Sequence, residues 1–269
     1  MAPRPKKYWG QHFLVDHHLA RQMVTAIDAP HPVLLIEIGP GKGILTRYLL
    51  DTACQYVGVE IDAELADYLR QTFGAFPHFH LLEADFLSLD LRLLFRHYPG
   101  HTPVVIGNIP YNITGPILFK LFPHYRELHQ AILMVQKEVA QRITASPGSK
   151  DFGILAIFSQ LYARVQYLWT VPAGRFFPRP RVDSAVVQFH FQKEATATIA
   201  SEILFQRLVK TAFQQRRKML KNSLSLLFPK EVLNKLAFDL NLRPEQVPLS
   251  DWIRLANQLY HLTPEREGS

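Results

Sequence analysis

The chain has 269 residues, 48% of them hydrophobic and 20% charged, which is enough length and apolar content for one or two globular cores. Its formal net charge of +7 favours a polyanionic partner, and a single cysteine, Cys54, excludes an intramolecular disulfide and suits a reducing cytoplasm. We find no secretory signal behind the basic N-terminus and no apolar run of about 18 residues, so we expect no membrane association.

Strand and helix patterns alternate along the first 191 residues. Pro3 and Pro5 predict an extended or irregular start, and Asp16 is a suitable N-cap for the first helix. Further helices are expected at about 44–52, 116–122, 137–145 and 153–163. The apolar runs between them predict an open α/β sheet of seven strands, at 33–39, 55–61, 80–85, 104–108, 131–136, 165–171 and 185–191.

Glycines and acidic residues follow the first three strands, at the sheet edge where open α/β folds bind ligands. Gly39 and Gly41 form a tight turn that lets the backbone approach a ligand closely, although they could be turn glycines alone. Glu60 lies 21 residues after Gly39, where its carboxylate can accept hydrogen bonds from both ribose hydroxyls of an adenosine ligand. Asp85 is placed to bond an adenine amino group, and its alternative role is an N-cap or turn acid.

A glycine turn and an acid on the second strand fit both dinucleotide and S-adenosylmethionine sites. The turn reads Gly-Pro-Gly-Lys-Gly from Gly39 to Gly43, without the G-x-G-x-x-G spacing that seats a pyrophosphate. No hydride-transfer machinery is visible. The order of glycine turn, ribose acid, adenine acid and then the amide of Asn108 therefore favours S-adenosylmethionine as the ligand.

The segment from Asn108 to Tyr111 carries the groups that methyl transfer to an exocyclic amine requires. The Asn108 side-chain oxygen and the Ile109 carbonyl are two acceptors that could draw the N–H groups of an adenine amine out of plane. Pro110 stiffens the turn, and Tyr111 offers a ring on which the base could stack. The alternative is that Asn-Ile-Pro-Tyr is simply a turn after a strand.

A proline-spaced loop, residues 176–184, separates the last two strands. Its prolines hold it extended, and we expect Arg179 and Arg181 to meet phosphates. Phe176 could clamp the second face of a flipped base, or it could be a core anchor beneath the loop.

Residues 193–200 form a small, polar linker, which divides the chain into an expected domain 1–195 and an all-helical domain 196–269. No acidic residue occurs between Glu202 and Glu231. If residues 204–224 form one helix, five cations share about a third of its circumference and predict phosphate contact, with a solvated face as the alternative. These five are Arg207, Lys210, Arg217, Lys218 and Lys221.

With these residues in place, the chain resembles the KsgA family of ribosomal RNA small-subunit adenine dimethyltransferases over nearly its whole length. The matching stretches are Gln11-His-Phe-Leu14, Glu37-Ile-Gly-Pro-Gly41, Val59-Glu-Ile-Asp62, Asn108-Ile-Pro-Tyr111, Gln136-Lys-Glu-Val139, Phe176-x-Pro-x-Pro-x-Val-Asp-Ser184 and Ala212-Phe-Gln-Gln-Arg-Arg-Lys218.

The resemblance implies a Rossmann-like, seven-stranded methyltransferase domain with a small C-terminal helical domain, acting as a monomer in the cytoplasm. It implies N6,N6-dimethylation of two adjacent adenosines near the 3′ end of 16S ribosomal RNA within the small subunit. The target adenine would meet Asn108 and Tyr111. The family more often has Asn at His12. By this resemblance the methyl donor would be held by His12, Leu14, Gly39, Glu60, Asp85 and Asn108.

Three other functions fit parts of the pattern. A large-subunit ribosomal RNA adenine methyltransferase of the antibiotic-resistance type shares Asn-Ile-Pro-Tyr, but the Arg-Arg-Lys stretch argues against it. An RNA-binding ribosome assembly factor, with catalysis secondary, would keep the same fold. A protein or DNA amine methyltransferase is a weaker third. No metal is expected, because the histidines show no paired ligand spacing and there is no second cysteine.

Overall fold

The computed structural model describes residues 3–6, 10–52 and 55–263, so the expectation for Cys54 lies outside the described residues. Its internal contacts divide the chain into two compact units. The sheet unit comprises residues 1–140 and 163–193, and the helical unit comprises residues 141–162 and 194–269. The junction after residue 193 lies two residues before the expected boundary at 195, whereas residues 141–162 group with the C-terminal helices rather than with the sheet. The ring of Phe158 meets that of Phe205 edge to face, with centroids 6.0 Å apart, and this is one of the contacts that join the stretch to those helices.

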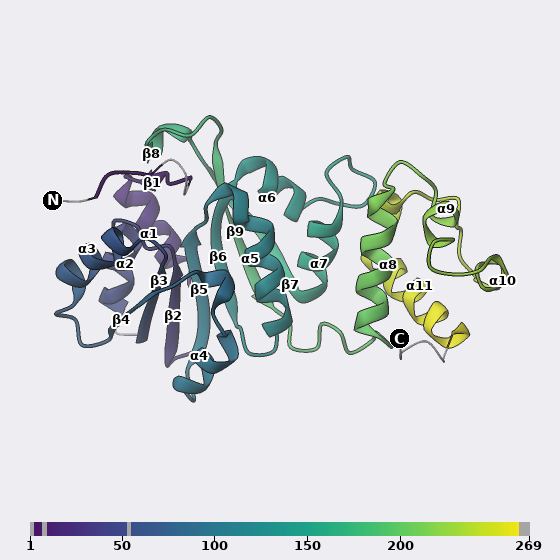
Figure 1. Cartoon of the computed structure of the whole chain (residues 1–269), viewed down its shortest axis with the longest axis horizontal. Helices are drawn as coiled ribbons and strands as arrows, with labels where there is room; N and C mark the ends of the chain where they lie inside the picture. The colour runs from purple at the N-terminus through teal and green to yellow at the C-terminus, as the bar shows by residue number, and fades with distance from the viewer. Residues whose placement is uncertain (1–2, 7–9, 53–54, 264–269) are drawn as a thin grey trace. The chain divides into compact units, whose positions relative to one another are not determined.

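A seven-stranded mixed sheet forms the centre of the sheet unit (Figure 1). The strand order is β4-β3-β2-β5-β6-β9-β7; the first five run parallel, and β9 pairs antiparallel with both β6 and β7. The central strands are buried along nearly their whole length, as expected of apolar runs covered on both faces. The α/β fold class and the seven strands predicted from sequence are thus confirmed. Their bounds are β2 (Val33–Ile38), β3 (Gln55–Glu60), β4 (Phe79–Glu83), β5 (Thr102–Asn108), β6 (Gln130–Gln136), β7 (Ala163–Val171) and β9 (Ser184–Phe191).

Helices connect the parallel strands, and side-chain caps fix where three of them begin. Asp16 accepts hydrogen bonds from the N–H groups of His18 and Leu19, as the sequence predicted, while Asp62 and Asp90 cap two later helices in the same way. The helices that begin in this unit are α1 (His17–Thr25), α2 (Ile44–Leu49), α3 (Ala63–Phe73), α4 (Leu91–His97), α5 (Thr114–Leu121) and α6 (Lys137–Ile143).

A second, two-stranded sheet joins segments far apart in the chain. Strand β1 (Phe13–Leu14) pairs antiparallel with β8 (Phe176–Phe177), so that Phe13 lies opposite Phe177 and Leu14 opposite Phe176. The Val15 N–H then donates to the Arg175 carbonyl at 2.9 Å. The chain just before α1 is therefore tied to the loop between β7 and β9. The sequence predicted an extended or irregular start but not this pairing.

The helical unit contains no strand among its described residues. Phe205, Leu208 and Trp252 are fully buried in its core. Its helices are α7 (Ile154–Tyr162), α8 (Glu202–Gln214), α9 (Leu220–Leu224), α10 (Lys230–Leu233) and α11 (Leu249–Leu262). None of the helices in the described residues is both long and apolar enough to cross a membrane.

The single helix expected over residues 204–224 is wrong. Helix α8 ends at Gln214, and its C-cap Gln215 leaves the helical region with φ −119° and ψ 45°. The chain then turns so that the N–H groups of Leu220 and Lys221 donate to the carbonyls of Leu242 and Leu240, at 2.8 and 2.9 Å. These long-range bonds replace helical ones, so the five cations do not share one helical face.

Candidate active site

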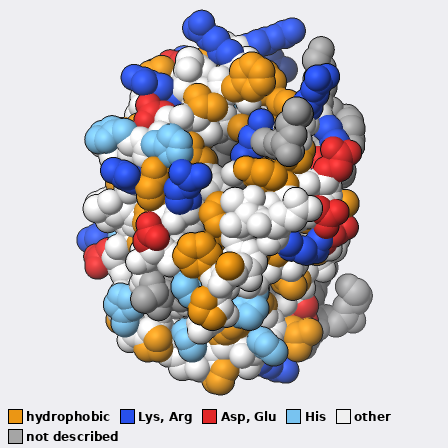
Figure 2. Space-filling model, turned by 90° about the vertical axis from the view of Figure 1, so that its left-hand side faces the viewer, with side chains coloured by type: hydrophobic (Ala, Val, Ile, Leu, Met, Phe, Trp, Pro, Cys, Tyr) orange, Lys and Arg blue, Asp and Glu red, His pale blue; other side chains and the backbone are white. Residues whose placement is uncertain are grey.

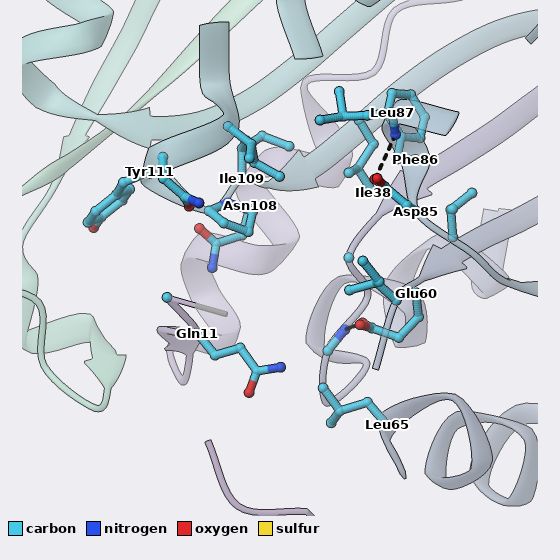
Figure 3. A pocket seen from close by; sticks show the side chains of 18 of the residues that line it. Gln11, Ile38, Glu60, Leu65, Asp85, Phe86, Leu87, Asn108, Ile109 and Tyr111 are labelled. Carbon is cyan, nitrogen blue, oxygen red and sulfur yellow. Dashed lines mark hydrogen bonds between the residues drawn. The ribbon is translucent and has the colours of Figure 1, made fainter. Parts of the chain in front are cut away.

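The main pocket lies at the carboxyl ends of β2, β3, β4 and β5 (Figure 3). The order of strands in the sheet reverses between β2 and β5, and this switch point is where open α/β sheets bind ligands. The N-terminal segment closes one side of the pocket with residues 10–13, and residues 108–113 line the side after β5. The expected site residues Gly39, Gly41, Glu60, Asp85, Asn108, Tyr111 and His12 all line it, together with Ile109 and Pro110.

The glycine turn after β2 has the backbone conformation that the sequence predicted. Gly39 and Gly41 have φ values of 61° and 60°, in the left-handed region that favours glycine. A Cβ added at Gly39 would meet nothing within 4 Å, whereas one at Gly41 would lie 3.0 Å from the Phe13 ring. The turn thus leaves open space for a ligand at Gly39 and is packed tightly at Gly41.

Glu60 ends β3 with its carboxylate at the wall of the pocket and only 4% exposed. One carboxylate oxygen accepts a hydrogen bond from the Gly41 N–H at 3.0 Å, and the other accepts one from the Asp62 N–H at 3.0 Å. Burial raises the pKa of this carboxyl above its ordinary value. Because each carboxylate oxygen can accept more than one hydrogen bond, the arrangement leaves acceptor capacity for ligand hydroxyls.

Strand β4 ends at Glu83, two residues before the end of the strand expected at 80–85, so Asp85 lies just beyond the strand. Its Oδ1 accepts a hydrogen bond from the Leu87 N–H at 2.9 Å and caps a short 3-10 turn (Phe86–Ser88). The N-cap role that the sequence left open is therefore present. Asp85 also lines the pocket, and the cap uses only one carboxylate oxygen, so a contact to an adenine amino group stays a prediction.

The Asn108 amide is oriented by the N-terminal segment. Its Nδ2 donates to the His12 carbonyl at 2.8 Å. A carbonyl can only accept, so this bond fixes which end of the amide is the nitrogen and leaves Oδ1 as the free acceptor. Figure 3 shows the side chain facing across the pocket from Glu60 and Asp85. The Ile109 N–H donates to the Met134 carbonyl at 2.9 Å, which anchors the turn on β6.

Tyr111 is held at both its hydroxyl and its ring. Its hydroxyl shares a hydrogen bond of 2.8 Å with the Ser184 hydroxyl, and burial raises the pKa of the phenol. The His12 imidazole stacks on the ring, with centroids 5.8 Å apart and planes at 25°. Nδ1 of that imidazole lies 2.7 Å from the Pro178 carbonyl, so Nδ1 carries the proton. One face of Tyr111 is therefore covered, and a target base would stack on the other.

Sequence reasoning missed the network behind Glu60. Asp62 accepts hydrogen bonds from Lys6 Nζ at 2.8 Å and from Gln11 Nε2 at 3.2 Å, while its own N–H binds Glu60. Burial alone would raise the pKa of Asp62, but these hydrogen bonds outweigh it and lower the pKa. The N-cap position of Asp62 before α3 was a readable signal, whereas no sequence pattern marked Lys6. Together, Lys6 and Asp62 tie the N-terminal segment to Glu60.

A buried carboxyl lies beneath the glycine turn. Glu37 is 1% exposed and accepts hydrogen bonds from the Thr46 and Tyr56 hydroxyls, both at 2.7 Å. Burial raises the pKa of Glu37 to about 7. This carboxyl joins β2, α2 and β3 directly below the pocket.

Two expected site residues lie in the core instead of the main pocket. Leu14 and Phe176 face each other across the β1–β8 pair and are each 4% exposed within the hydrophobic core. The predicted clamp role of Phe176 is therefore not compatible with this arrangement, which matches the core anchor that the sequence left open. Leu14 lines a smaller hollow that shares Gly39, Gly41 and Asn108 with the main pocket.

The expected RNA-contacting cations are distributed over both units. Arg179 and Arg181 are exposed in the loop after β8, and Arg207 and Lys210 are exposed on α8. Arg217 and Lys218 lie exposed in the turn after α8, and Lys221 on α9 donates to Asn241 at 3.0 Å. No group of three His, Cys, Asp or Glu residues that could hold a metal occurs in the described part of the chain.

The family model described as ribosomal RNA adenine dimethylase matches residues 3–260, which is nearly the whole chain. This chain belongs to that family. The family predicted from the sequence motifs is thus confirmed, while the acceptor role of Asn108 stays a prediction.

Curated relatives of this dimethylase cover almost its full length. The chain is 41% identical over 268 residues to the ribosomal RNA small subunit methyltransferase A of Rippkaea orientalis, covering 96% of this chain and 98% of the relative. It is 39% identical over 263 residues to the protein of the same name from Pseudomonas aeruginosa, covering 98% and 97%.

Solved structures support the fold. A dimethyladenosine transferase from Plasmodium falciparum superposes with a TM-score of 0.77 at 24% identity, covering 94% of this chain and 98% of the other. The 23S ribosomal RNA methyltransferase ErmE superposes with a TM-score of 0.68 at 24% identity, covering 92% and 99%. At this identity both structures speak for the fold alone.

Proposed function

We propose that this dimethylase transfers methyl groups from S-adenosylmethionine to N6 of two adjacent adenosines near the 3′ end of 16S ribosomal RNA in the small subunit. The observation that carries the proposal is the orientation of Asn108. Its Nδ2 is committed to the His12 carbonyl, so Oδ1 is the acceptor available to an amine entering the pocket.

The pocket residues fit S-adenosylmethionine as the methyl donor. Glu60 has acceptor capacity for two ribose hydroxyls, Asp85 can accept from an adenine amine, and the open space at Gly39 admits a ligand against the backbone. The donor would supply an electrophilic methyl group on its sulfonium.

The chain contributes positioning and hydrogen-bond acceptors to the reaction. Asn108 Oδ1 and the Ile109 carbonyl can accept the two N–H groups of the adenine amine, which localises the nitrogen lone pair for attack on the methyl carbon. Tyr111 can hold the base by stacking on the ring face that His12 leaves open. Because the amine is neutral, its proton can leave after the methyl group arrives, and no general base is required.

The small subunit is the favoured target because the curated relatives, at 39–41% identity over nearly the whole chain, carry that subunit in their names. The likeness to ErmE does not favour the large subunit, since it is a likeness of fold at 24% identity. Action as a monomer is part of the proposal, and ribosomal RNA as substrate would place the enzyme in the cytoplasm.

The test is to incubate the purified protein and labelled S-adenosylmethionine with small subunits from cells that lack this modification. We expect N6,N6-dimethyladenosine at two adjacent adenosines near the 3′ end, and no label in subunits that already carry it. Label in naked large-subunit RNA instead would support the resistance-type alternative. Tight subunit binding without label anywhere would support an assembly factor.

A further inference from the structure

One aromatic side chain beside the pocket is left exposed by the β1–β8 pair. Along β8 the side chains alternate, so that Phe176 is buried and Phe177 is 60% exposed. The cross-strand partner of Phe177 is Phe13, whose side chain contacts the glycine turn and lines the pocket. In the described residues Phe177 makes no ring or cation contact of its own. An uncovered aromatic face therefore lies one strand away from the pocket wall.

The residues that follow Phe177 make its surroundings cationic. Arg179 and Arg181 are exposed, and among the described residues neither forms an ion pair or a side-chain hydrogen bond. Arg175, on the other side, is paired with Asp16 at 3.0 Å. The β1–β8 pair lies at the upper end of the sheet unit in Figure 1, and Figure 2 shows Lys and Arg side chains gathered at that end with hydrophobic side chains between them.

We infer that Phe177 is a stacking platform for an unpaired RNA base, the neighbour of the adenosine that enters the pocket, with Arg179 and Arg181 contacting the phosphates on either side. This inference rests on the proposed function. For a substrate with two adjacent target adenosines, the base on Phe177 is the second adenosine of the pair.

The chemistry of the patch favours single-stranded RNA over a protein or a membrane. Proteins that bind single strands combine a cationic path for the backbone with aromatic rings on which bases stack. Here the Phe177 ring and the two unpaired guanidinium groups of Arg179 and Arg181 lie at every second residue of an extended, proline-containing segment. A base drawn into the pocket loses its stacking on its neighbour, so a platform for that neighbour compensates for part of the loss.

Phe177 does not compete for the target base itself. Tyr111 provides the stacking face inside the pocket, next to Asn108, and His12 already covers its other face. Phe177 lies opposite Phe13 in the β1–β8 pair and is not among the residues that line the pocket. The two rings therefore suit two successive bases of one strand.

The experiment compares Phe177→Ala, Phe177→Leu, Phe177→Tyr and Phe177→Trp in equilibrium binding of small subunits and in the KM for subunits during methylation. We expect Ala and Leu to weaken binding and raise KM by about tenfold, with Tyr and Trp close to the wild type, because stacking needs a π face and not merely apolar bulk. The affinity for S-adenosylmethionine should be unchanged in all four. Phe76→Ala, which removes another partly exposed phenylalanine, is the matched control and should bind like the wild type.

Two results would overturn the platform: Phe177→Ala binding subunits as tightly as Phe76→Ala, or Leu restoring binding as fully as Trp. Because Phe177 is exposed, we do not expect its replacement by Ala to misfold the protein. Weakened binding by Phe177→Ala together with normal binding by Phe177→Tyr and Phe177→Trp therefore reports the loss of the ring. A wild-type protein that binds subunits without methylating them would refute the proposed function, and the binding series would still decide the platform.

Discussion

Asn108 uses the two ends of its amide for two different tasks. Nδ2 donates to the His12 carbonyl, and we propose that Oδ1 accepts a hydrogen bond from the target amine. We expect Asn108→Ala to lower turnover by about 100-fold or more, because an acceptor aimed at the reacting group is lost. The affinity for S-adenosylmethionine should survive in good part. Turnover and donor affinity are measured separately, by methyl transfer to small subunits and by equilibrium titration.

Asn108→Asp sharpens this test. A carboxylate keeps an acceptor but places a second oxygen against the His12 carbonyl, so the orienting hydrogen bond is lost. We therefore expect this variant to be impaired as well. Asn234→Ala, which removes an exposed amide outside the pocket, is the matched control and should retain most activity. Near-normal methylation by Asn108→Ala would remove the acceptor role.

Glu37 gives the ligand-free protein a pH-dependent loss of stability. Its pKa in the folded protein is about 7, above the ordinary value of 4.5, because burial disfavours the carboxylate. Between these two values the folded state keeps a proton that the unfolded state has released, so the stability from this group falls as pH rises and is fully lost above about pH 7.

We expect Glu37→Gln, which stays neutral, to gain stability relative to the wild type as pH rises from 5 to 8. The gain corresponds to at most about 3 kcal/mol. It is measured as the difference in the free energy of unfolding between the two proteins at each pH, so the other titrating groups cancel. A difference that is the same at both pH values would mean that Glu37 is ionised throughout.

Among the connecting elements, the turn from β2 into α2 is the most constrained. We expect Gly41→Ala to destabilise the protein by about 1–2 kcal/mol, because an L side chain is strained at φ 60°. The new Cβ would also press on the Phe13 ring, 3.0 Å away, and displace it toward the pocket. We therefore expect the affinity for S-adenosylmethionine to fall by about tenfold, measured by titration calorimetry.

Gly100→Ala separates strain from displacement. Gly100 has a comparable φ of 76°, but a Cβ there would meet nothing within 4 Å. The Gly100→Ala variant should lose about as much stability as Gly41→Ala while keeping its affinity for S-adenosylmethionine. If both variants lose donor affinity equally, the effect at Gly41 is one of general stability and the contact with Phe13 plays no part.

Elements with local signals were predictable from the sequence. The buried strands read as apolar runs, and Asp16 capped its helix as expected, because cap and strand preferences depend on neighbouring residues. The sequence also predicted that one pocket would contain Glu60, Asp85 and Asn108, because the carboxyl ends of parallel strands share one edge of a sheet.

Features set by long-range contacts were not predictable. Strand β1 has only two residues and exists because it pairs with β8, more than 160 residues away in the chain, so no periodicity marks it. The break after Gln214 has no glycine or proline to signal it and is held by hydrogen bonds to residues 240 and 242. The same β1–β8 pairing buries Phe176, for which the sequence left open a clamp or a core anchor, and it exposes Phe177.

At the scale of the whole molecule, the excess positive charge divides into cations with partners and cations without. Several are paired with carboxylates within the fold, among them Lys6, Arg70, Arg175 and Arg254. Arg179, Arg181, Arg217 and Lys218 are exposed and have no ion-pair partner in the described residues. Such uncompensated cations are the ones that can release counterions from a polyanion on binding.

The turn after α8 is a direct test of that division. We expect the double variant Arg217→Ala, Lys218→Ala to weaken small-subunit binding and to flatten the plot of log affinity against log salt by about 1.4–1.8, the loss of two phosphate contacts. The measurement is equilibrium binding over a series of salt concentrations. The melting temperature should change little, because both side chains are exposed.

Arg216 is the matched control. It has the same charge as Arg217 and lies next to it, but its side chain binds other residues of the helical unit. Its guanidinium donates to the Lys150 carbonyl and lies 3.9 Å from a Glu245 carboxylate oxygen. Arg216→Ala should therefore lower the melting temperature and leave the salt slope nearly intact. If the double variant keeps the wild-type salt slope instead, Arg217 and Lys218 are solvated surface cations. The RNA affinity of this dimethylase must then come from charges elsewhere, and Arg179 and Arg181 beside the pocket are the next cations to remove.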